Sequence, residues 1–172
     1  VRALILGGAR SGKSALAEEQ ALALGGASVL YVATALASRD PEMEQRVRIH
    51  RQRRPAGWGT FELGGGDLER ILDAAERWRA VLLDSLTLWV SARMLEGEGE
   101  EATLEQFDRF LKGAAVLATP LVLVSDEVGF GVVPDSGSGR RFRDTLGLVN
   151  QRAAAVAEEV RLCVAGIGVR IK

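Results

Sequence analysis

An α/β fold with a mostly parallel sheet flanked by helices is predicted by two features of the sequence. Short apolar runs alternate along the chain with segments of helical periodicity. The apolar runs are continuous rather than alternating, which is typical of strands buried on both faces of a parallel sheet. A length of 172 residues suits one compact domain, so we expect residues 1–172 to form a single domain.

The expected strands and helices follow one another along the whole chain. Strands are expected at 3–6, 29–33, 81–83, 121–125 and 160–165. Helices are expected at 14–24, 40–53, 67–79, 86–96, 103–118 and 141–159. The helix at 40–53 has Asp40 as its N-cap and Pro41 at its first position, and it must end before Pro55. The glycine-rich stretch 129–139 carries Pro134 and Asp135 and is interpreted as a mobile loop near a site.

A phosphate-binding loop lies between the first strand and the first helix. The eight residues Gly7-Gly8-Ala9-Arg10-Ser11-Gly12-Lys13-Ser14 fit the pattern G-x-x-x-x-G-K-[ST], in the strand-to-helix context that this pattern requires. Backbone N–H groups of such a loop and the helix N-terminus bind phosphate oxygens. Lys13 would contact the β- and γ-phosphates, and the Ser14 hydroxyl would bind Mg²⁺. The sequence therefore predicts binding of a nucleoside triphosphate.

Carboxylates follow two of the apolar strands. Asp84 ends the run at 80–84, and Asp126 with Glu127 follows the run at 121–124. A P-loop enzyme uses such a carboxylate to hold its metal ion, although acids at strand ends also serve as caps of the next helix. We assign the metal to Asp84. Asp126 and Glu127 could place the acceptor or act as a base, and their spacing leaves these roles open.

A strongly basic segment contains the only histidine of the chain. Residues 46–54 hold five arginines and His50, with no acidic residue. A solvated basic helix face would look the same. Guanidinium groups, however, favour the neutral form of a neighbouring imidazole, which can then attack phosphorus, and they stabilise negative charge on phosphate oxygens. In a chain that binds a triphosphate, this segment predicts a nucleophilic histidine.

Composition argues against several other functions. The 22 Lys and Arg balance 23 Asp and Glu, and aromatic residues are only 5%, so we expect no nucleic-acid partner. A regulatory GTPase needs an Asn-Lys-x-Asp block, whereas Gln151 follows the single asparagine, Asn150. No apolar run approaches the length of a transmembrane segment, and the single Cys163 cannot form an intramolecular disulfide and lies in an apolar run. We expect a cytoplasmic protein with a buried cysteine.

Taken together in chain order, several blocks resemble the bifunctional adenosylcobinamide kinase / adenosylcobinamide-phosphate guanylyltransferase family. The blocks are Leu6 to Ser14, Tyr31-Val32-Ala33-Thr34-Ala35, Asp40-Pro41-Glu42-Met43, Arg46-x-x-x-His50-Arg51-x-x-Arg54-Pro55-x-x-Trp58-x-Thr60-x-Glu62, Glu127-Val128-Gly129-x-Gly131-Val132-Val133-Pro134, Arg143-Asp144, Asn150-Gln151 and Val164-Ala165-Gly166. The phosphate loop is common to many families, but the histidine-arginine and Glu-Val-Gly-x-Gly blocks in this order are far more specific.

The resemblance implies a RecA-like P-loop fold and two reactions. In the first, ATP or GTP phosphorylates the aminopropanol hydroxyl of adenosylcobinamide. In the second, GTP transfers GMP to a histidine, a role that only His50 can take, and then to adenosylcobinamide phosphate, which yields adenosylcobinamide-GDP. The resemblance also implies Mg²⁺ (or Mn²⁺) as cofactor and a homotrimer.

The resemblance further implies which residues form the site. His50 and Lys13 are the catalytic residues, and Ser14 and Asp84 bind the metal. The nucleotide-binding residues are Gly7, Gly8, Ala9, Arg10, Ser11, Gly12, Lys13, Ser14, Ala33, Thr34, Ala35, Arg51, Gln52, Arg53, Arg54, Glu62 and Asp84. Asp84 stands where some members carry Glu, and the segment 51–54 is more basic than in some. The alternative is a P-loop small-molecule or nucleoside kinase in which His50 and its arginines only clamp phosphates.

Overall fold

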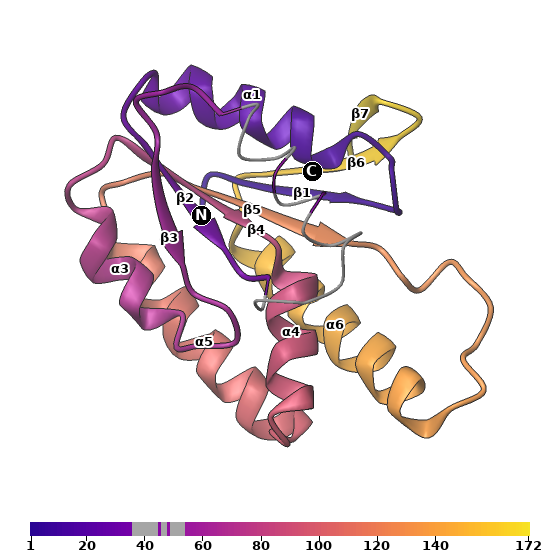
Figure 1. Cartoon of the computed structure of the whole chain (residues 1–172). Coiled ribbons are helices and arrows are strands. Elements are labelled where there is room, and N and C mark those ends of the chain that lie inside the picture. The colour runs from indigo at the N-terminus through magenta and orange to yellow at the C-terminus, as the bar shows by residue number, and fades with distance from the viewer. Residues whose placement is uncertain (36–44, 46–47, 49–53) are drawn as a thin grey trace.

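The computed structural model describes residues 1–35, 45, 48 and 54–172, and within them the strands form one seven-stranded sheet (Figure 1). The strands are β1 (Ala3–Gly7), β2 (Val29–Ala33), β3 (Gly59–Glu62), β4 (Ala80–Asp84), β5 (Leu121–Asp126), β6 (Glu159–Val164) and β7 (Ile167–Arg170). Their order across the sheet is β3-β2-β4-β5-β1-β6-β7. All neighbouring strands are parallel except β6 and β7. The α/β prediction with a mostly parallel sheet is confirmed.

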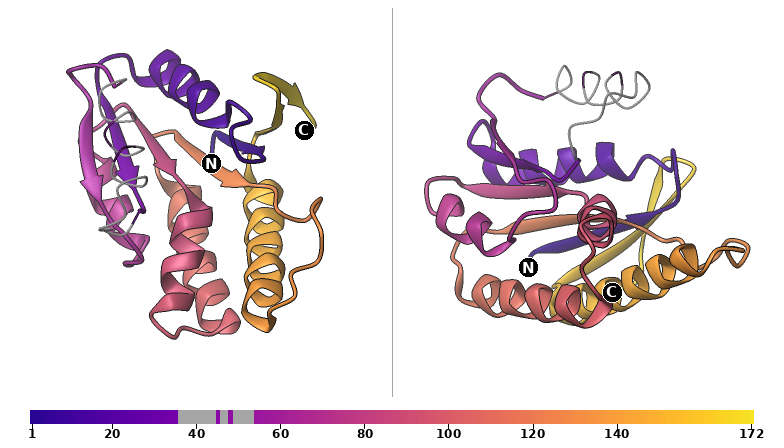
Figure 2. Two further views of the ribbon diagram at one scale, coloured as in Figure 1. Left: turned by 45° about the vertical axis from the view of Figure 1, so that its right-hand side comes forward. Right: turned by 60° about the horizontal axis from the view of Figure 1, so that its bottom comes forward.

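Helices cover both faces of this sheet. The described helices are α1 (Lys13–Gly25), α3 (Glu69–Ala75), α4 (Leu86–Leu95), α5 (Glu100–Val116) and α6 (Gly137–Val156). Helix α1 lies on one face, whereas α3, α4, α5 and α6 lie on the other, as the two views of Figure 2 show. None of the described helices is long and apolar enough to cross a membrane.

Two apolar cores result from the alternation of side chains along the strands. On the α1 face, Ala17 and Ala21 of the helix pack against strand residues such as Ile5 and Leu82. On the other face, the larger core includes Trp89, Phe107 and Phe110, whose rings stack at centroid distances of 5.9 and 6.1 Å. Strand β1 is buried at every position, because it contributes to both cores. The continuous apolar runs of the sequence have this origin.

Two strands, β3 and β7, were not predicted from the sequence, and both lie at the edges of the sheet. Strand β3 has only four residues, with alternate ones exposed, and β7 is antiparallel and largely exposed. Edge strands carry one buried face or none, so they lack the continuous apolar run that marked the central strands. In β7 the preceding turn is decisive: Ala165 and Gly166 both have positive φ, 51° and 81°, and close a two-residue hairpin.

Helix boundaries differ from the sequence prediction by a few residues. Helix α3 is shorter than the expected 67–79, α5 begins earlier than 103, and α6 covers 137–156 instead of 141–159. Helix α6 starts early because the Ser136 hydroxyl caps it by accepting a hydrogen bond from the Gly139 N–H (3.1 Å). Of the helix expected at 40–53, the structure describes only Gln45 and Arg48, which are helical and exposed.

Candidate active site

The phosphate loop connects β1 to α1 in the conformation that its glycines permit. Gly12, immediately before the helix, has a φ of 93°, a region that side chains with a Cβ rarely adopt. Arg10 also has a positive φ, 56°. Residues 8–10 and Gly12 of the loop are exposed, while Gly7 and Ser11 are buried. The loop thus presents its backbone to solvent at the N-terminus of α1, where phosphate oxygens are favoured.

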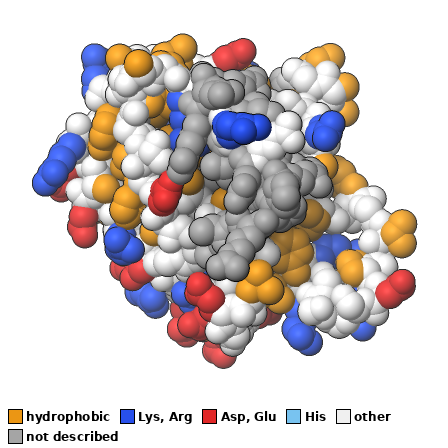
Figure 3. All heavy atoms as spheres, in the orientation of Figure 1, with side chains coloured by type: hydrophobic (Ala, Val, Ile, Leu, Met, Phe, Trp, Pro, Cys, Tyr) orange, Lys and Arg blue, Asp and Glu red, His pale blue; other side chains and the backbone are white. Residues whose placement is uncertain are grey.

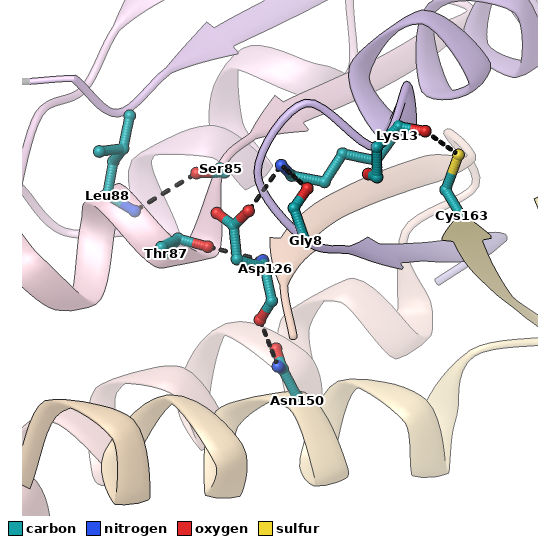
Figure 4. A network of polar contacts seen from close by, with 9 residues as sticks. Gly8, Lys13, Ser85, Thr87, Leu88, Asp126, Asn150 and Cys163 are labelled. Atoms are coloured by element: carbon teal, nitrogen blue, oxygen red, sulfur yellow. Dashed lines mark hydrogen bonds and ion pairs between the residues drawn. The ribbon is translucent and has the colours of Figure 1, made fainter. Parts of the chain in front are cut away.

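The hairpin formed by β6 and β7 contacts the phosphate loop through hydrogen bonds to Ser11. The carbonyl oxygen of Ser11 accepts hydrogen bonds from the Gly166 N–H (2.8 Å) and from the Cys163 thiol (3.0 Å; Figure 4). A Cβ built on Gly12 would lie 3.0 Å from the Gly166 Cα, so the two segments approach closely. Cys163 is buried, as the sequence predicted. Its position in an apolar run did not predict the hydrogen bond that its thiol donates to Ser11.

The carboxyl ends of five parallel strands bring the predicted site residues to one edge of the sheet. Register pairs Gly7 with Asp126, and Ala33 with both Asp84 and Glu62. Open α/β sheets bind ligands at this edge. Leu82 lies two residues before Asp84, and Val124 lies two residues before Asp126. The side chains of Leu82 and Val124 belong to the core on the α1 face. Both carboxylates therefore stand on the face of the sheet that carries the phosphate loop.

Asp84 is held by a buried tyrosine. The Tyr31 hydroxyl donates a hydrogen bond to Asp84 Oδ2 at 2.9 Å. Burial, reinforced by the negative charge of Asp84, raises the pKa of Tyr31 far above its ordinary value. The phenol therefore stays protonated and remains a donor. It fixes the orientation of the carboxylate and leaves Oδ1 as the oxygen available to other partners.

The segments after β2 and β4 are tied to each other by Thr34. Its hydroxyl donates to the Ser85 carbonyl oxygen (2.7 Å) and accepts from the Ser85 N–H (2.8 Å). Thr34 is fully buried, and the Ala33 carbonyl oxygen accepts from the Leu63 N–H (2.8 Å). The predicted nucleotide-binding segment 33–35 thus lies beside Asp84, and Glu62 ends the next strand outward.

Asp126 forms an ion pair with the phosphate-loop lysine. Lys13 Nζ lies 2.6 Å from Asp126 Oδ1, and it also donates to the Gly8 carbonyl oxygen at 3.3 Å (Figure 4). The side chains of Lys13 and Asp126 are only 13% and 22% exposed. The sequence left the role of Asp126 open, and the structure places it next to the residue expected to contact the transferred phosphate.

The basic segment meets the rest of the site at Arg54. Its guanidinium stacks on the Tyr31 ring, with Cζ 3.3 Å from the ring centroid, and Nη1 donates to Thr60 Oγ1 at 3.1 Å. Arg54 thereby contacts the tyrosine that holds Asp84. The predicted residues His50, Arg51, Gln52 and Arg53 lie outside the described residues.

The described residues fit a magnesium ion bound together with nucleotide phosphates. Ser14 and Asp84 offer a hydroxyl and a carboxylate, the oxygen ligands that Mg²⁺ prefers while it keeps several waters. Among the described residues there is no group of three or more His, Cys, Asp or Glu side chains that could hold a metal ion alone. In P-loop enzymes the nucleotide phosphates supply further ligands to the metal.

A loop with an apolar surface connects β5 to α6. It leaves β5 directly after Asp126 and runs to the start of α6. Phe130 and Val132 on this loop are 83% and 94% exposed. Figure 3 shows apolar side chains on the right of the molecule, where this loop runs in Figure 1. The predicted loop 129–139 is a loop only as far as Ser136, because residues 137–139 belong to the first turn of α6, and its place near a site stays a prediction. Its movement stays a prediction.

Sequence reasoning missed three residues that support the site. Thr87 and Asn150 both bind the backbone of Asp126, and Tyr31 orients Asp84. Tyr31 carried a weak signal, because it is the only tyrosine of the chain and it interrupts an apolar strand. Asn150 carried a signal as the only asparagine and as part of a block that resembles the family, but no indication of its partner, and Thr87 gave no signal, since each contacts a residue more than twenty positions away.

Comparison with protein families and curated proteins gives full-length matches. The model of the family described as "Cobinamide kinase / cobinamide phosphate guanyltransferase" matches residues 3–171. The "Bifunctional adenosylcobalamin biosynthesis protein CobP" of Pseudomonas aeruginosa is 41% identical over 172 residues, covering 100% of this chain and 98% of that protein. The "Bifunctional adenosylcobalamin biosynthesis protein CobU" of Salmonella typhimurium is 40% identical over 183 residues, covering 98% of each.

Solved structures with the same arrangement of strands and helices are distant in sequence. The flagellar accessory protein FlaH of Methanocaldococcus jannaschii has a TM-score of 0.54 at 14% identity, over 99% of this chain and 77% of that one. The RadB recombinase has a TM-score of 0.54 at 18% identity, over 94% and 73%. At this identity the similarity concerns the fold alone, and it agrees with the expected RecA-like P-loop fold.

Proposed function

The chain belongs to the cobinamide kinase / cobinamide phosphate guanyltransferase family, and we propose that it catalyses both reactions of a bifunctional enzyme of cobalamin biosynthesis. It phosphorylates adenosylcobinamide with ATP or GTP. It then transfers GMP from GTP, through a guanylylated histidine, to adenosylcobinamide phosphate and forms adenosylcobinamide-GDP. The observation that carries this proposal is the phosphate loop, whose Lys13 forms an ion pair with Asp126 at the carboxyl end of β5. A bifunctional relative matches the chain over its full length.

The kinase reaction depends on the phosphate loop. Backbone N–H groups of residues 7–14 bind the β- and γ-phosphates, and the Lys13 ammonium neutralises the charge that develops on the transferred group. Lys13 must leave Asp126 to do so, which a rotation of its flexible side chain achieves. Ser14 and Asp84 would hold Mg²⁺, and the ion would supply further charge neutralisation at the phosphates.

The guanylyl transfer reaction depends on His50. A neutral imidazole attacks the α-phosphorus of GTP, pyrophosphate leaves, and the phosphoramidate then gives GMP to the phosphate of the corrinoid. Arg51, Gln52, Arg53 and Arg54 bind the nucleotide phosphates with their donor groups. Residues 33–35 and Glu62 also contribute to nucleotide binding. The stacking of Arg54 on Tyr31 supports this arrangement, because it anchors the end of the basic segment beside Asp84.

The decisive experiment is labelling with GTP that carries a labelled α-phosphate. With Mg²⁺ and this GTP we expect the protein to become labelled, with a bond that resists alkali and is cleaved by acid. His50→Asn should abolish the label. A lysine phosphoramidate would behave similarly towards acid and alkali, so Lys112→Arg, on the exposed side of α5, is the matched control and should keep the label.

Two outcomes would contradict the guanylyl transfer proposal. A wild-type protein that takes no label, or a label that survives His50→Asn, would remove the covalent step. The alternative, a P-loop small-molecule or nucleoside kinase, would then remain, with His50 and the arginines acting only as phosphate clamps.

We also propose that the enzyme works as a homotrimer in the cytoplasm, without a nucleic-acid partner. The full-length family relationship supports the trimer, and the net charge of −1 supports the absence of a nucleic-acid partner. Sedimentation velocity of the purified protein tests the trimer directly, and a monomer or dimer at micromolar concentration would contradict it.

A further inference from the structure

We propose that Asp126 is the general base of the kinase reaction and has no corresponding role in guanylyl transfer. Its carboxylate would take the proton of the acceptor hydroxyl while that oxygen attacks the γ-phosphorus. This inference rests on the proposed function, and it assigns to one residue the chemistry that separates the two reactions.

The position of Asp126 relative to Lys13 is the first argument. Oδ1 of Asp126 lies 2.6 Å from the ammonium that contacts the β- and γ-phosphates in P-loop enzymes. A carboxylate at this distance stands beside the place that the γ-phosphate takes when nucleotide binds. An acceptor hydroxyl that approaches the γ-phosphorus therefore comes within reach of Asp126.

The anchoring of Asp126 is the second argument. Its N–H donates to Thr87 Oγ1 of α4 (2.7 Å), and its carbonyl oxygen accepts from Asn150 Nδ2 of α6 (3.0 Å; Figure 4). The next N–H, of Glu127, donates to the carbonyl oxygen of Gly7 in β1 (3.2 Å). Three elements thus fix the backbone that carries this carboxylate, as a positioned proton acceptor requires.

The other carboxylates nearby are engaged differently. Oδ2 of Asp84 accepts from Tyr31 at 2.9 Å, and Asp84 is the residue expected to bind the metal. Oε1 of Glu127 accepts from the N–H of Gly129 at 2.7 Å, within its own loop. Of the two acids at the end of β5, Asp126 is the one that contacts the phosphate-loop lysine. The geometry thus decides between the roles that spacing left open.

The two reactions differ in whether a proton must be removed from the acceptor. In the kinase step, the acceptor O–H bond breaks and its proton passes to Asp126, while the oxygen forms a bond to the γ-phosphorus. The bond from the γ-phosphorus to the bridging oxygen breaks, and its electron pair leaves with the nucleoside diphosphate. Asp126 then returns the proton to water. In guanylyl transfer the acceptor is a phosphate monoester, which is already largely dianionic at neutral pH.

Asp126→Asn tests the proposal when the two reactions are measured separately in the full-length protein. We expect kcat for phosphorylation of adenosylcobinamide to fall about 10²- to 10⁴-fold, with KM for the nucleotide little changed. Labelling with α-labelled GTP should stay within about threefold of the wild type, because the imidazole nitrogen that attacks the α-phosphorus carries no proton to be removed. Asp108→Asn is the matched control, since it removes an ion pair of the same 2.6 Å length, to Arg152 in the outer helical layer, and should leave both reactions unchanged.

Two results would overturn the proposal. If Asp126→Asn lowers both reactions in parallel, Asp126 only positions Lys13. If it lowers neither, Asp126 does not take part in proton transfer. Failure of the proposed function itself would appear in the wild type, as a missing label or missing kinase activity, and is therefore distinguishable.

A second pair of variants covers the case that Asp126→Asn does not fold. Thr87→Val removes the acceptor of the Asp126 N–H and should lower kcat of the kinase reaction several-fold, whereas Thr87→Ser keeps the hydroxyl and should restore it. The label should be the same in both variants. A loss of label in Thr87→Val equal to its loss of kinase activity would contradict the proposal.

Discussion

The ends of β4 and β5 look alike in sequence and differ in the structure. Each strand is an apolar run that ends in an aspartate, the two strands are neighbours, and both carboxylates stand on the face of the phosphate loop. Asp84 accepts a hydrogen bond from a neutral phenol, whereas Asp126 pairs with a cation. A neutral donor does not neutralise the carboxylate of Asp84, which we propose to bind the metal, while Asp126 lies next to Lys13, which we propose to bind the reacting phosphate. The partner, rather than the residue type, separates the two roles.

Replacing the aspartate at the end of β4 should reduce activity more than any other substitution considered below. Asp84→Asn should lower both the kinase and the labelling reaction by about a hundredfold or more, because both use a metal-bound triphosphate and a neutral amide holds the metal poorly. The amide oxygen can still accept from Tyr31, so the local fold is kept. Rates measured over a range of Mg²⁺ concentrations should show a raised requirement for the metal.

The matched variant at β5 is Asp126→Asn, which should leave the Mg²⁺ requirement unchanged. An equal shift of the Mg²⁺ dependence in both variants would show that the two carboxylates share one role. Asp84 and Asp126 would then not have the distinct roles proposed for them.

A smaller effect is expected when only the donor to Asp84 is removed. Tyr31→Phe keeps the ring under Arg54 but deletes the hydroxyl that orients the carboxylate. A hydrogen bond to a charged group contributes about 1.5 kcal/mol, so we expect both reactions to slow about tenfold. The same two assays check this. A loss confined to one reaction would mean that Tyr31 does not act through Asp84.

Tyr31 should not ionise at high pH in the folded protein. Burial and the charge of Asp84 raise the pKa of Tyr31, the only tyrosine, so the folded protein should show no tyrosinate absorbance at about pH 11. The unfolded chain should ionise near its ordinary value of about 10. Because the folded-state pKa is the higher one, this group favours folding fully below about pH 10, and its contribution is lost progressively above it.

Absorbance spectra recorded with and without denaturant test this titration. Tyrosinate absorbance in the native protein at the same pH as in the unfolded chain would show that the phenol is not a permanent donor. Asp84 would then lack the neutral partner on which its difference from Asp126 depends.

Much of the fold could be predicted from the sequence because the central strands are recognisable as continuous apolar runs. Runs such as 81–83 and 121–125 are buried on both faces, so their sequences are continuously apolar, and the order of strands and helices followed from them. The edge strands β3 and β7 were missed for the opposite reason, since exposure removes that signal. The phosphate loop was readable because its chemistry demands particular residues at fixed spacing.

Local patterns in the sequence were enough to predict the fold class, the family and Lys13, Ser14 and Asp84 as site candidates. The contacts that surround these residues depend on the tertiary structure. Cys163 contacts Ser11 across 152 positions, Tyr31 contacts Asp84 across 53, and Thr87 contacts Asp126 across 39. Contacts over such distances are set by how strands pair in the sheet, and local periodicity carries no information about pairing. Two aspartates that look equal along the chain became different for that reason.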